Sequence, residues 1–317
     1  MNKKIPFSLP YIDNSVIEEV KSVFTETGWL TSGPKVLDFE KEIVKNTNSN
    51  AVVCVNSWTS GAMLVLRWFN IMPGDEVIIP SYTYSATALC VLNIGAIPVM
   101  VDVGDDFNID PKNLEPIITE KTKAIIPVDI AGLPCDYDSI NSIVNLPRIK
   151  KKFVANGNNQ KKLGRILVIS DAAHSLGGIY KSKLVGSLCD ITILSFHSVK
   201  NITTGEGGAV CLNLPSVFDF NDEYKSMKIL SLNGQSKSAF QKLEPGKWRY
   251  DIIAQGLKVN MPDICAAIGL AQIKIYNRIL LPERKKIFNS YNKFFDKFDW
   301  AITPKVKNDD IESSYHL

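Results

Sequence analysis

Two residues able to take part in covalent chemistry follow apolar runs near the middle of the chain. Asp171 comes directly after ILVIS (166–170), and Lys200 lies between ITILSF (191–196) and the glycine-rich run TTGEGG (203–208). A carboxylate at the carboxyl end of a buried strand lies where α/β proteins bind ligands, although Asp is also a common helix N-cap. A lysine in such a turn is either a solvated loop residue or a partly desolvated amine that acts as a Schiff-base nucleophile. These residues alone leave both interpretations open.

Hydroxyl groups accompany two of the apolar runs. Thr59 lies in NSWTSGA, directly after AVVCV (51–55), and Ser195 lies inside the run that precedes Lys200. The N-terminus of a helix attracts phosphate because its N–H groups are unpaired and its dipole is positive there. Ordinary capping by Ser57 or Thr59 explains the same residues.

An aromatic residue, Tyr84, lies in PSYTYSATA, just past the apolar run EVIIP (76–80). Its ring either stacks on a planar ligand or packs into the core. A ligand-binding role would place Tyr84, Thr59 and Asp171 around one crevice at the ends of their strands.

Short apolar runs rich in Val and Ile alternate with longer amphipathic stretches. Such runs are typical of strands buried on both faces, as in a parallel sheet, and the stretches between them have helical spacing. We therefore expect a doubly wound α/β domain with a mostly parallel sheet. The predicted strands are 51–55, 76–80, 97–103, 124–130, 166–170, 191–196 and 209–213, and the predicted helices are 14–24, 35–46, 57–70 and 136–144.

The alternation of predicted strands and helices ends in the last third of the chain. Residues 262–298 have helical spacing, and Pro262 stands where a long helix would start. We expect this helix to lead from a large domain, residues 1–235, into a smaller C-terminal α+β domain, of which residues 236–317 are the start.

The composition limits the classes of function that this protein can have. The chain has 317 residues, of which 45% are hydrophobic and 22% charged, with a formal net charge of +3. These values are ordinary for a globular protein and give no sign of nucleic-acid binding. No run of 18 or more apolar residues occurs, so we expect no membrane span. The N-terminal MNKKIPFSLP lacks the apolar region of a secretory signal.

Cysteine and histidine usage points away from disulfides and metals. None of the cysteines forms a CxxC pair, and most lie in apolar runs, which favours buried thiols in a reducing cytoplasm. The chain has three histidines in no metal-binding spacing, so we expect no catalytic metal. The six cysteines are Cys54, Cys90, Cys135, Cys189, Cys211 and Cys265.

One segment departs from the α/β rhythm. Residues 145–166 contain seven Lys and Arg residues and no acidic residue. A solvated surface insertion is the simpler interpretation, and a basic flap near a phosphate-bearing substrate is the alternative.

Taken together, the motifs resemble those of the DegT/DnrJ/EryC1/StrS family of sugar-nucleotide aminotransferases. These enzymes bind pyridoxal 5'-phosphate (PLP) and have the aspartate-aminotransferase fold, PLP fold type I. The resemblance extends over residues 28–317. It rests on the order GWLTSGP, NSWTSGA, PSYTYSATA, SDAAHSLGG, SFHSVKNITTGEGG and KVNMPDICAAIGLAQ.

The resemblance implies roles for the residues around the cofactor ring. Lys200 matches the Schiff-base lysine, which later moves the proton, and Asp171 matches the acid that pairs with the pyridine nitrogen. His174 matches a position near the ring hydroxyl of the cofactor. Tyr84 matches the aromatic residue that stacks on the ring. We therefore expect Lys200 and Asp171 to be catalytic.

Further roles follow for the cofactor phosphate. Trp58, Thr59 and Ser195 match phosphate-binding positions, and Asn260 matches an asparagine that reaches the phosphate of the neighbouring subunit's cofactor. A homodimer with shared active sites is therefore expected. The family usually has a small residue at the position of Trp58, so its indole must find room away from the phosphate. Family members also continue past SSYHL (313–317), so we expect an incomplete small domain.

The resemblance implies transfer of an amino group from an amino acid, with L-glutamate as donor, to a nucleotide-linked keto sugar. C4 of a UDP-linked 4-keto-6-deoxy sugar is the favoured acceptor, for cell-surface polysaccharide, lipopolysaccharide or other glycan biosynthesis. A 3-keto sugar or a dTDP-linked sugar is the alternative. PLP-dependent sugar dehydratases carry His in place of the lysine and fit less well. A non-catalytic protein of the same fold that only binds nucleotide sugars is the alternative from another class.

Overall fold

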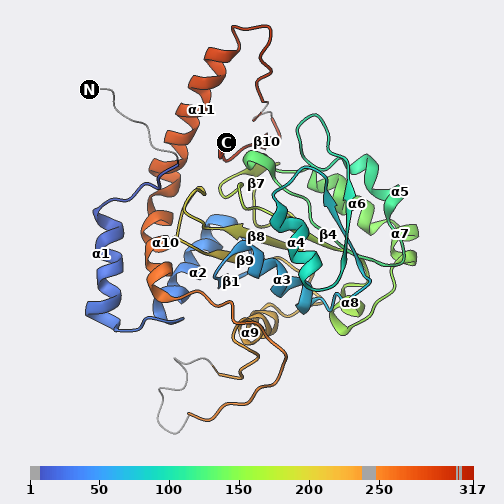
Figure 1. Cartoon of the computed structure of the whole chain (residues 1–317), viewed down its shortest axis with the longest axis horizontal. Helices are drawn as coiled ribbons and strands as arrows, with labels where there is room; N and C mark the ends of the chain where they lie inside the picture. Colours follow the sequence, from blue (N-terminus) through green and yellow to red (C-terminus); the bar gives the residue numbers. More distant parts are fainter. Residues whose placement is uncertain (1–7, 238–247, 305, 307–308) are drawn as a thin grey trace.

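The computed structural model describes residues 8–237, 248–304, 306 and 309–317. Helices and strands alternate along most of the chain (Figure 1). The helices are α1 (Asn14–Ser22), α2 (Pro34–Thr47), α3 (Trp58–Trp68), α4 (Ser85–Asn93), α5 (Leu114–Ile117), α6 (Tyr137–Asn145), α7 (Pro147–Lys152), α8 (Asn158–Leu163), α9 (Phe220–Ser231), α10 (Asp263–Ile275) and α11 (Leu281–Phe295). The strands are β1 (Ala51–Val55), β2 (Glu76–Pro80), β3 (Ile97–Val101), β4 (Thr122–Ile125), β5 (Leu167–Asp171), β6 (Ile179–Tyr180), β7 (Lys183–Leu184), β8 (Ile191–Ser195), β9 (Gly208–Leu212) and β10 (Ile311–Glu312).

Seven strands form one central sheet in the order β1-β9-β8-β5-β4-β2-β3. The strands from β8 across to β3 are parallel, and β9 runs antiparallel to both β8 and β1. The carboxyl ends of the other strands and the amino end of β9 therefore meet at one edge of the sheet. This arrangement confirms the predicted mostly parallel α/β fold.

Both faces of the sheet are buried, which explains the nearly continuous apolar runs. Along β1, Val52 and Cys54 face one apolar cluster together with Phe39 of α2. Val53 and Val55 face the second cluster, which includes the apolar side of α3. Alternate residues of one strand thus point to opposite faces.

Strand ends differ from the prediction where the backbone cannot continue the ladder. The predicted strand 124–130 is β4, Thr122–Ile125, and ends before Pro127. Proline has no N–H to donate, so it rarely lies inside a central strand. The pairing resumes only as an isolated bridge between Val128 and Asp171.

The long helix predicted over residues 262–298 is present as α10, a π-helical turn (Tyr276–Leu280) and α11. Asp263–Phe295 is long and apolar enough to cross a membrane by length and composition alone. However, α10 lies beside α1 and packs against α2, and its buried residues include Ala266 and Leu270 (Figure 1). Packing inside the protein therefore accounts for its apolar face.

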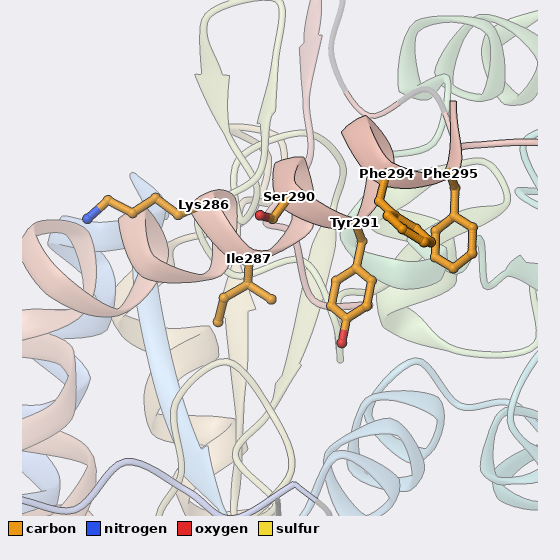
Figure 2. Close-up of a pocket in the computed structure, with 6 residues that line it drawn as sticks. All are labelled: Lys286, Ile287, Ser290, Tyr291, Phe294 and Phe295. Atoms are coloured by element: carbon orange, nitrogen blue, oxygen red, sulfur yellow. The ribbon is translucent and has the colours of Figure 1, made fainter. Parts of the chain in front are cut away.

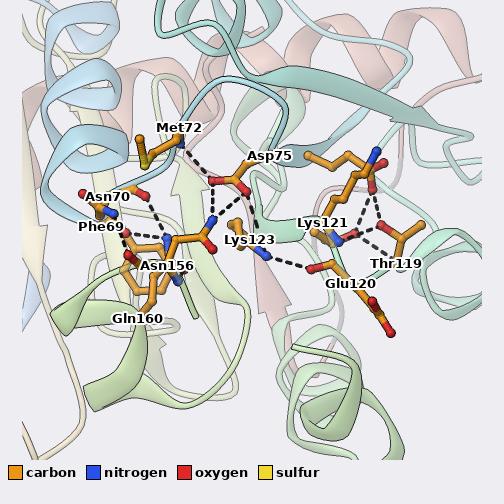
Figure 3. A network of polar contacts seen from close by, with 12 residues as sticks. Phe69, Asn70, Met72, Asp75, Thr119, Glu120, Lys121, Lys123, Asn156 and Gln160 are labelled. Carbon is orange, nitrogen blue, oxygen red and sulfur yellow. Dashed lines mark hydrogen bonds and ion pairs between the residues drawn. The ribbon is translucent and has the colours of Figure 1, made fainter. Parts of the chain in front are cut away.

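The basic segment 145–166 folds as α7 and α8 and is tied to the body of the protein. Arg165, just before β5, forms a bidentate ion pair with the buried Asp190, and each of the two bonds is 2.7 Å long. Asn156 donates to Asp75 at 2.9 Å, in a network that includes the buried Lys123 (Figure 3). Because Arg165 precedes β5, this part of the segment lies at the amino edge of the sheet. These contacts favour the interpretation as a surface insertion.

The C-terminal residues return to the body of the protein. Ile311 pairs with Tyr180, so that β10, β6 and β7 form a small antiparallel sheet. The division into domains at residue 235 stays a prediction.

Candidate active site

A cavity of about 610 Å³ opens at the carboxyl edge of the central sheet. Its wall contains all of the predicted site residues except Asn260. They come from four places: the start of α3 after β1, the start of α4 after β2, the end of β5, and the segment that follows β8. The predicted residues in the wall are Trp58, Thr59, Tyr84, Asp171, His174, Ser195 and Lys200.

Asp171 is the last residue of β5 and is 5% exposed. Its Oδ2 accepts a hydrogen bond from Thr87 Oγ1 at 3.0 Å, and its Oδ1 accepts one from the Ala173 N–H at 3.2 Å. Burial raises the pKa of the carboxyl to about 7, against the opposing effect of these hydrogen bonds. Turns follow β5 rather than a helix, so the N-cap interpretation of Asp171 is wrong.

Lys200 lies in a turn, and its backbone N–H donates to the His197 carbonyl at 2.9 Å. Burial lowers the pKa of its amine, and the nearby Asp171 carboxylate partly opposes this shift. A lysine with a lowered pKa is more often neutral and therefore a better nucleophile. The structure therefore does not support the interpretation of Lys200 as an ordinary solvated lysine.

The N-terminus of α3 supplies unpaired backbone donors at the cavity. Ser57 is its N-cap and accepts from the Ser60 N–H at 3.1 Å, which confirms the capping role. The start of β9 lies so close that a Cβ atom on Gly208 would come within 2.8 Å of the Trp58 nitrogen. A glycine is therefore needed here. Ser195 pairs with Gly208 across β8 and β9, which places its hydroxyl beside this helix end.

Tyr84 and His174 line other parts of the cavity. Tyr84 is 78% exposed, so its interpretation as a core residue is wrong, and its ring is free to face a ligand. Burial, together with the positive charge of Lys200, lowers the pKa of His174 to about 3. His174 is therefore a neutral imidazole at ordinary pH.

Two observations test whether these residues fit PLP. Within the described residues, Trp58 Nε1 and His174 Nδ1 are the buried side-chain polar atoms that have no hydrogen-bond partner. Both residues line the cavity, but the Trp58 indole packs in the apolar cluster, so only the orphaned His174 Nδ1 bears on a ligand. The cavity also combines a helix N-terminus for phosphate, a buried acid and a desolvated lysine. The residues fit the cofactor.

The Trp58 side chain is accommodated as the resemblance required. It is 5% exposed and packs within the apolar cluster between α3 and the sheet. The backbone start of α3 consequently remains open to the cavity.

Asn260 lies apart from the other predicted residues. Its Nδ2 donates to Ser32 Oγ at 2.8 Å, and its Oδ1 accepts from Lys258 Nζ at 2.6 Å. It lines a different hollow, together with Lys228 of α9. Its role toward a neighbouring subunit stays a prediction.

Several residues in the cavity wall were not predicted from the sequence. Thr87 binds Asp171 and lies three residues after Tyr84, one turn along α4, so helical spacing could have indicated it. His197 and Glu206 also line the cavity, with 3.7 Å between Nε2 and Oε1. Nothing in their local pattern distinguished these two from ordinary loop residues.

Another hollow, of about 540 Å³, lies along α11 (Figure 2). It is lined by Lys286, Ile287, Ser290, Tyr291, Phe294 and Phe295. None of the predicted site residues lies there, so the cavity at the sheet edge is the candidate active site.

Comparisons with known proteins agree with this assignment. The sequence pattern of the DegT/DnrJ/EryC1/StrS aminotransferase family matches residues 10–150 and 158–317. The spore coat polysaccharide biosynthesis protein SpsC of Bacillus subtilis is 37% identical over 318 residues, which cover 100% of this chain and 75% of that protein. The UDP-4-amino-4-deoxy-L-arabinose--oxoglutarate aminotransferase of Shewanella sediminis is 38% identical over 86% of this chain and 64% of its own length.

Solved structures are similar over the same range. The putative sugar aminotransferase Spr1654 of Streptococcus pneumoniae, in its PMP-form, superimposes with a TM-score of 0.92 at 42% identity, over 99% of this chain and 78% of that chain. Its PLP-form gives a TM-score of 0.90 at 40% identity, over 99% of this chain and 77% of that chain.

Proposed function

Because this chain belongs to the DegT/DnrJ/EryC1/StrS aminotransferase family and is a PLP-dependent sugar aminotransferase, we propose that it aminates C4 of a UDP-linked 4-keto-6-deoxy sugar. We further propose L-glutamate as the amino donor. The observation that carries this proposal is the cavity that holds both Lys200 and the buried Asp171.

The relatives support the choice of C4, of UDP and of the amino donor. The Shewanella enzyme is named for a UDP-linked 4-amino sugar and for oxoglutarate, the keto acid that corresponds to glutamate. SpsC is named for spore coat polysaccharide biosynthesis. We infer by similarity that the product of this chain also enters a polysaccharide or another cell-surface glycan.

The residues of the cavity have distinct tasks. PLP, when bound, accepts the electron pair released at the donor's α-carbon. Asp171 would keep the pyridine nitrogen protonated, because a buried carboxylate is stabilised by an adjacent positive charge. The Lys200 amine, once free, would carry the proton taken from the donor's α-carbon. The α3 N-terminus with Thr59 and Ser195 would hold the phosphate.

We propose a homodimer as the active form. Asn260 lies outside its own chain's cavity and is half-buried, and its contacts with Ser32 and Lys258 leave one Nδ2 hydrogen for a second subunit. A cytoplasmic location is consistent with six cysteines that are all free thiols, each in the described part of the chain.

The test is a product assay against 3-keto and 4-keto sugars linked to UDP or dTDP, with L-glutamate as donor. Mass spectrometry should detect an amino product from the UDP-linked 4-keto sugar, at a kcat/KM at least about 10-fold above the others. A preference for a 3-keto or a dTDP-linked sugar would overturn the assignment of C4 or of UDP. Binding of nucleotide sugar without any product would favour the non-catalytic alternative.

A further inference from the structure

The last residues of the chain fold onto the wall of the active-site cavity. Ser314 donates its N–H to the Gly132 carbonyl at 3.0 Å and its hydroxyl to the His174 carbonyl at 2.5 Å. The His316 N–H donates to the Ala131 carbonyl at 3.2 Å. Ala131 and Tyr315 have φ values of 55° and 56°, in the left-handed region that non-glycine residues rarely adopt. Such backbone persists where the surrounding contacts enforce it.

Asn201, the neighbour of Lys200, holds the His316 ring. Asn201 Nδ2 faces acceptors only, namely the carbonyls of His174 and Leu176 and the hydroxyl of Tyr276, at 3.0–3.3 Å. Its Oδ1 must therefore be the atom that lies 2.7 Å from His316 Nδ1. Since Oδ1 can only accept, His316 carries its proton on Nδ1.

The ring held in this way lies against His174. The two imidazoles are stacked, with 4.4 Å between their centroids and 23° between their planes. His316 is 9% exposed and Asn201 is 5% exposed, so both side chains are buried within this set of contacts. Tyr276, in the π-helical turn between α10 and α11, closes the group by donating to the Leu176 carbonyl.

Resting on the proposed function, we propose that His316 is a positioning residue of the active site. Asn201 fixes the His316 ring, and the His316 ring fixes the plane of the His174 imidazole in the cavity wall. A bound cofactor would therefore contact a His174 ring that is held in a single orientation. The contacts from Asn201 through His316 to His174 also link the segment that carries Lys200 to the turn after β5.

The charges around the histidine pair oppose protonation. After burial, His174, Lys200 and Arg284 lower the pKa of His316, and Lys200 lowers the pKa of His174. Burial is the larger effect, and it lowers the pKa of His316 to about 2. Opening the stack to water would remove much of this burial, so the pKa of His174 would rise toward its ordinary value.

Two variants separate the effect of the stacked ring from that of the hydrogen bond to Asn201. His316→Ala removes both the ring and the hydrogen bond to Asn201. His316→Phe keeps a ring over His174 and loses the donor to Asn201. Leu317→Ala, at an exposed neighbouring position, is the matched control.

The first readout is NMR of the histidine ring protons in the cofactor-free protein, in which three histidines make assignment simple. The wild-type and His316→Phe proteins should show a His174 signal that does not titrate near neutral pH, and His316→Ala should show one that does. This readout does not depend on amino transfer, so it separates failure of this proposal from failure of the proposed function.

The second readout is the kinetics of the amino-donor step. Both variants should lower kcat by about 10- to 100-fold with the donor KM within about twofold, because misorientation in the site affects the reacting geometry rather than binding. His316→Phe should lie between the wild type and His316→Ala. A folded His316→Ala whose His174 signal and kcat match the wild type would overturn the proposal. If His316→Ala fails to fold, His316→Phe with wild-type kcat would overturn it.

Discussion

Thr87 Oγ1 donates a hydrogen bond of 3.0 Å to Oδ2 of Asp171 and so joins helix α4 to the end of strand β5. The Thr87 hydroxyl is in turn 2.8 Å from that of Thr83. Asp171 is thus tied to α4 in the wall of the cavity, where it would meet the pyridine nitrogen of a bound cofactor.

Removing this bond should weaken the site without removing the acid. Thr87 lowers the pKa of Asp171, so Thr87→Val should raise that pKa and disfavour the carboxylate. We expect an affinity for PLP about 10- to 100-fold lower, in line with about 1.5–3 kcal/mol for a hydrogen bond to a charged group. Equilibrium dialysis measures it. Thr83→Val, one step further from Asp171, should have a smaller effect; equal effects would contradict the direct role of Thr87.

Replacing the lysine should stop the reaction outright. Lys200→Arg keeps a positive charge but has no amine that can become neutral, so turnover and the absorbance of lysine-bound cofactor should both be lost. Activity assays and the absorbance spectrum check this. Lys183→Arg, at an exposed position in β7, serves as control and should behave like the wild type. Full activity of Lys200→Arg would refute the assignment.

The α3 N-terminus should recognise the phosphate rather than the ring. Thr59→Val should lower the affinity for PLP by about 10-fold, the loss of one hydrogen bond to a charged group. Its affinity for pyridoxal, which lacks the phosphate, should not change. Parallel titrations with the two ligands test this, with the exposed Thr25→Val as control. An equal loss for both ligands would place Thr59 elsewhere in the site.

The rate of cofactor capture should follow the ionisation of Lys200. Only the neutral amine attacks the aldehyde, so the rate should rise with pH with a midpoint below pH 10.5, the ordinary pKa of lysine. In Asp171→Asn the opposing carboxylate is gone, so the pKa of Lys200 should fall further and the plateau should begin at lower pH. Stopped-flow absorbance measures both profiles. A plateau that moves upward in Asp171→Asn would contradict the electrostatic account.

The basic segment should matter for stability rather than for substrate binding. Arg165→Met leaves Asp190 buried without its partner and should cost about 3–5 kcal/mol of unfolding free energy. Arg148→Met removes an exposed pair with Glu115 and should cost far less. Urea unfolding compares the two. A raised sugar KM in Arg148→Met or Lys150→Met, with unchanged stability, would instead support the phosphate flap.

Much of the fold is predictable from local pattern because the sheet is buried on both faces. The strands at 51–55 and 76–80 have the bounds that their apolar runs indicate, β1 and β2. The two-residue strands β6, β7 and β10 are too short to leave a pattern. They form because segments distant in sequence meet, as Ile311 and Tyr180 do.

The active site likewise contains residues that local pattern predicts and contacts that it does not predict. Residues at or shortly after strand ends, such as Asp171 and Thr59, are indicated by parallel-sheet geometry, because strand ends meet at one edge. The pairing of His316 with Asn201 joins residues 115 positions apart and depends on the path of the C-terminal segment. No spacing rule predicts such a contact, so tertiary structure was needed to find it.

The most direct test of the central claim is a spectral titration of the PLP-loaded protein with L-glutamate. We predict that the absorbance of the lysine-bound cofactor disappears as 2-oxoglutarate forms in about a stoichiometric amount, and that adding the UDP-linked 4-keto sugar restores it. Persistence of that absorbance with L-glutamate and with every other amino donor would contradict the claim that this cavity performs amino transfer.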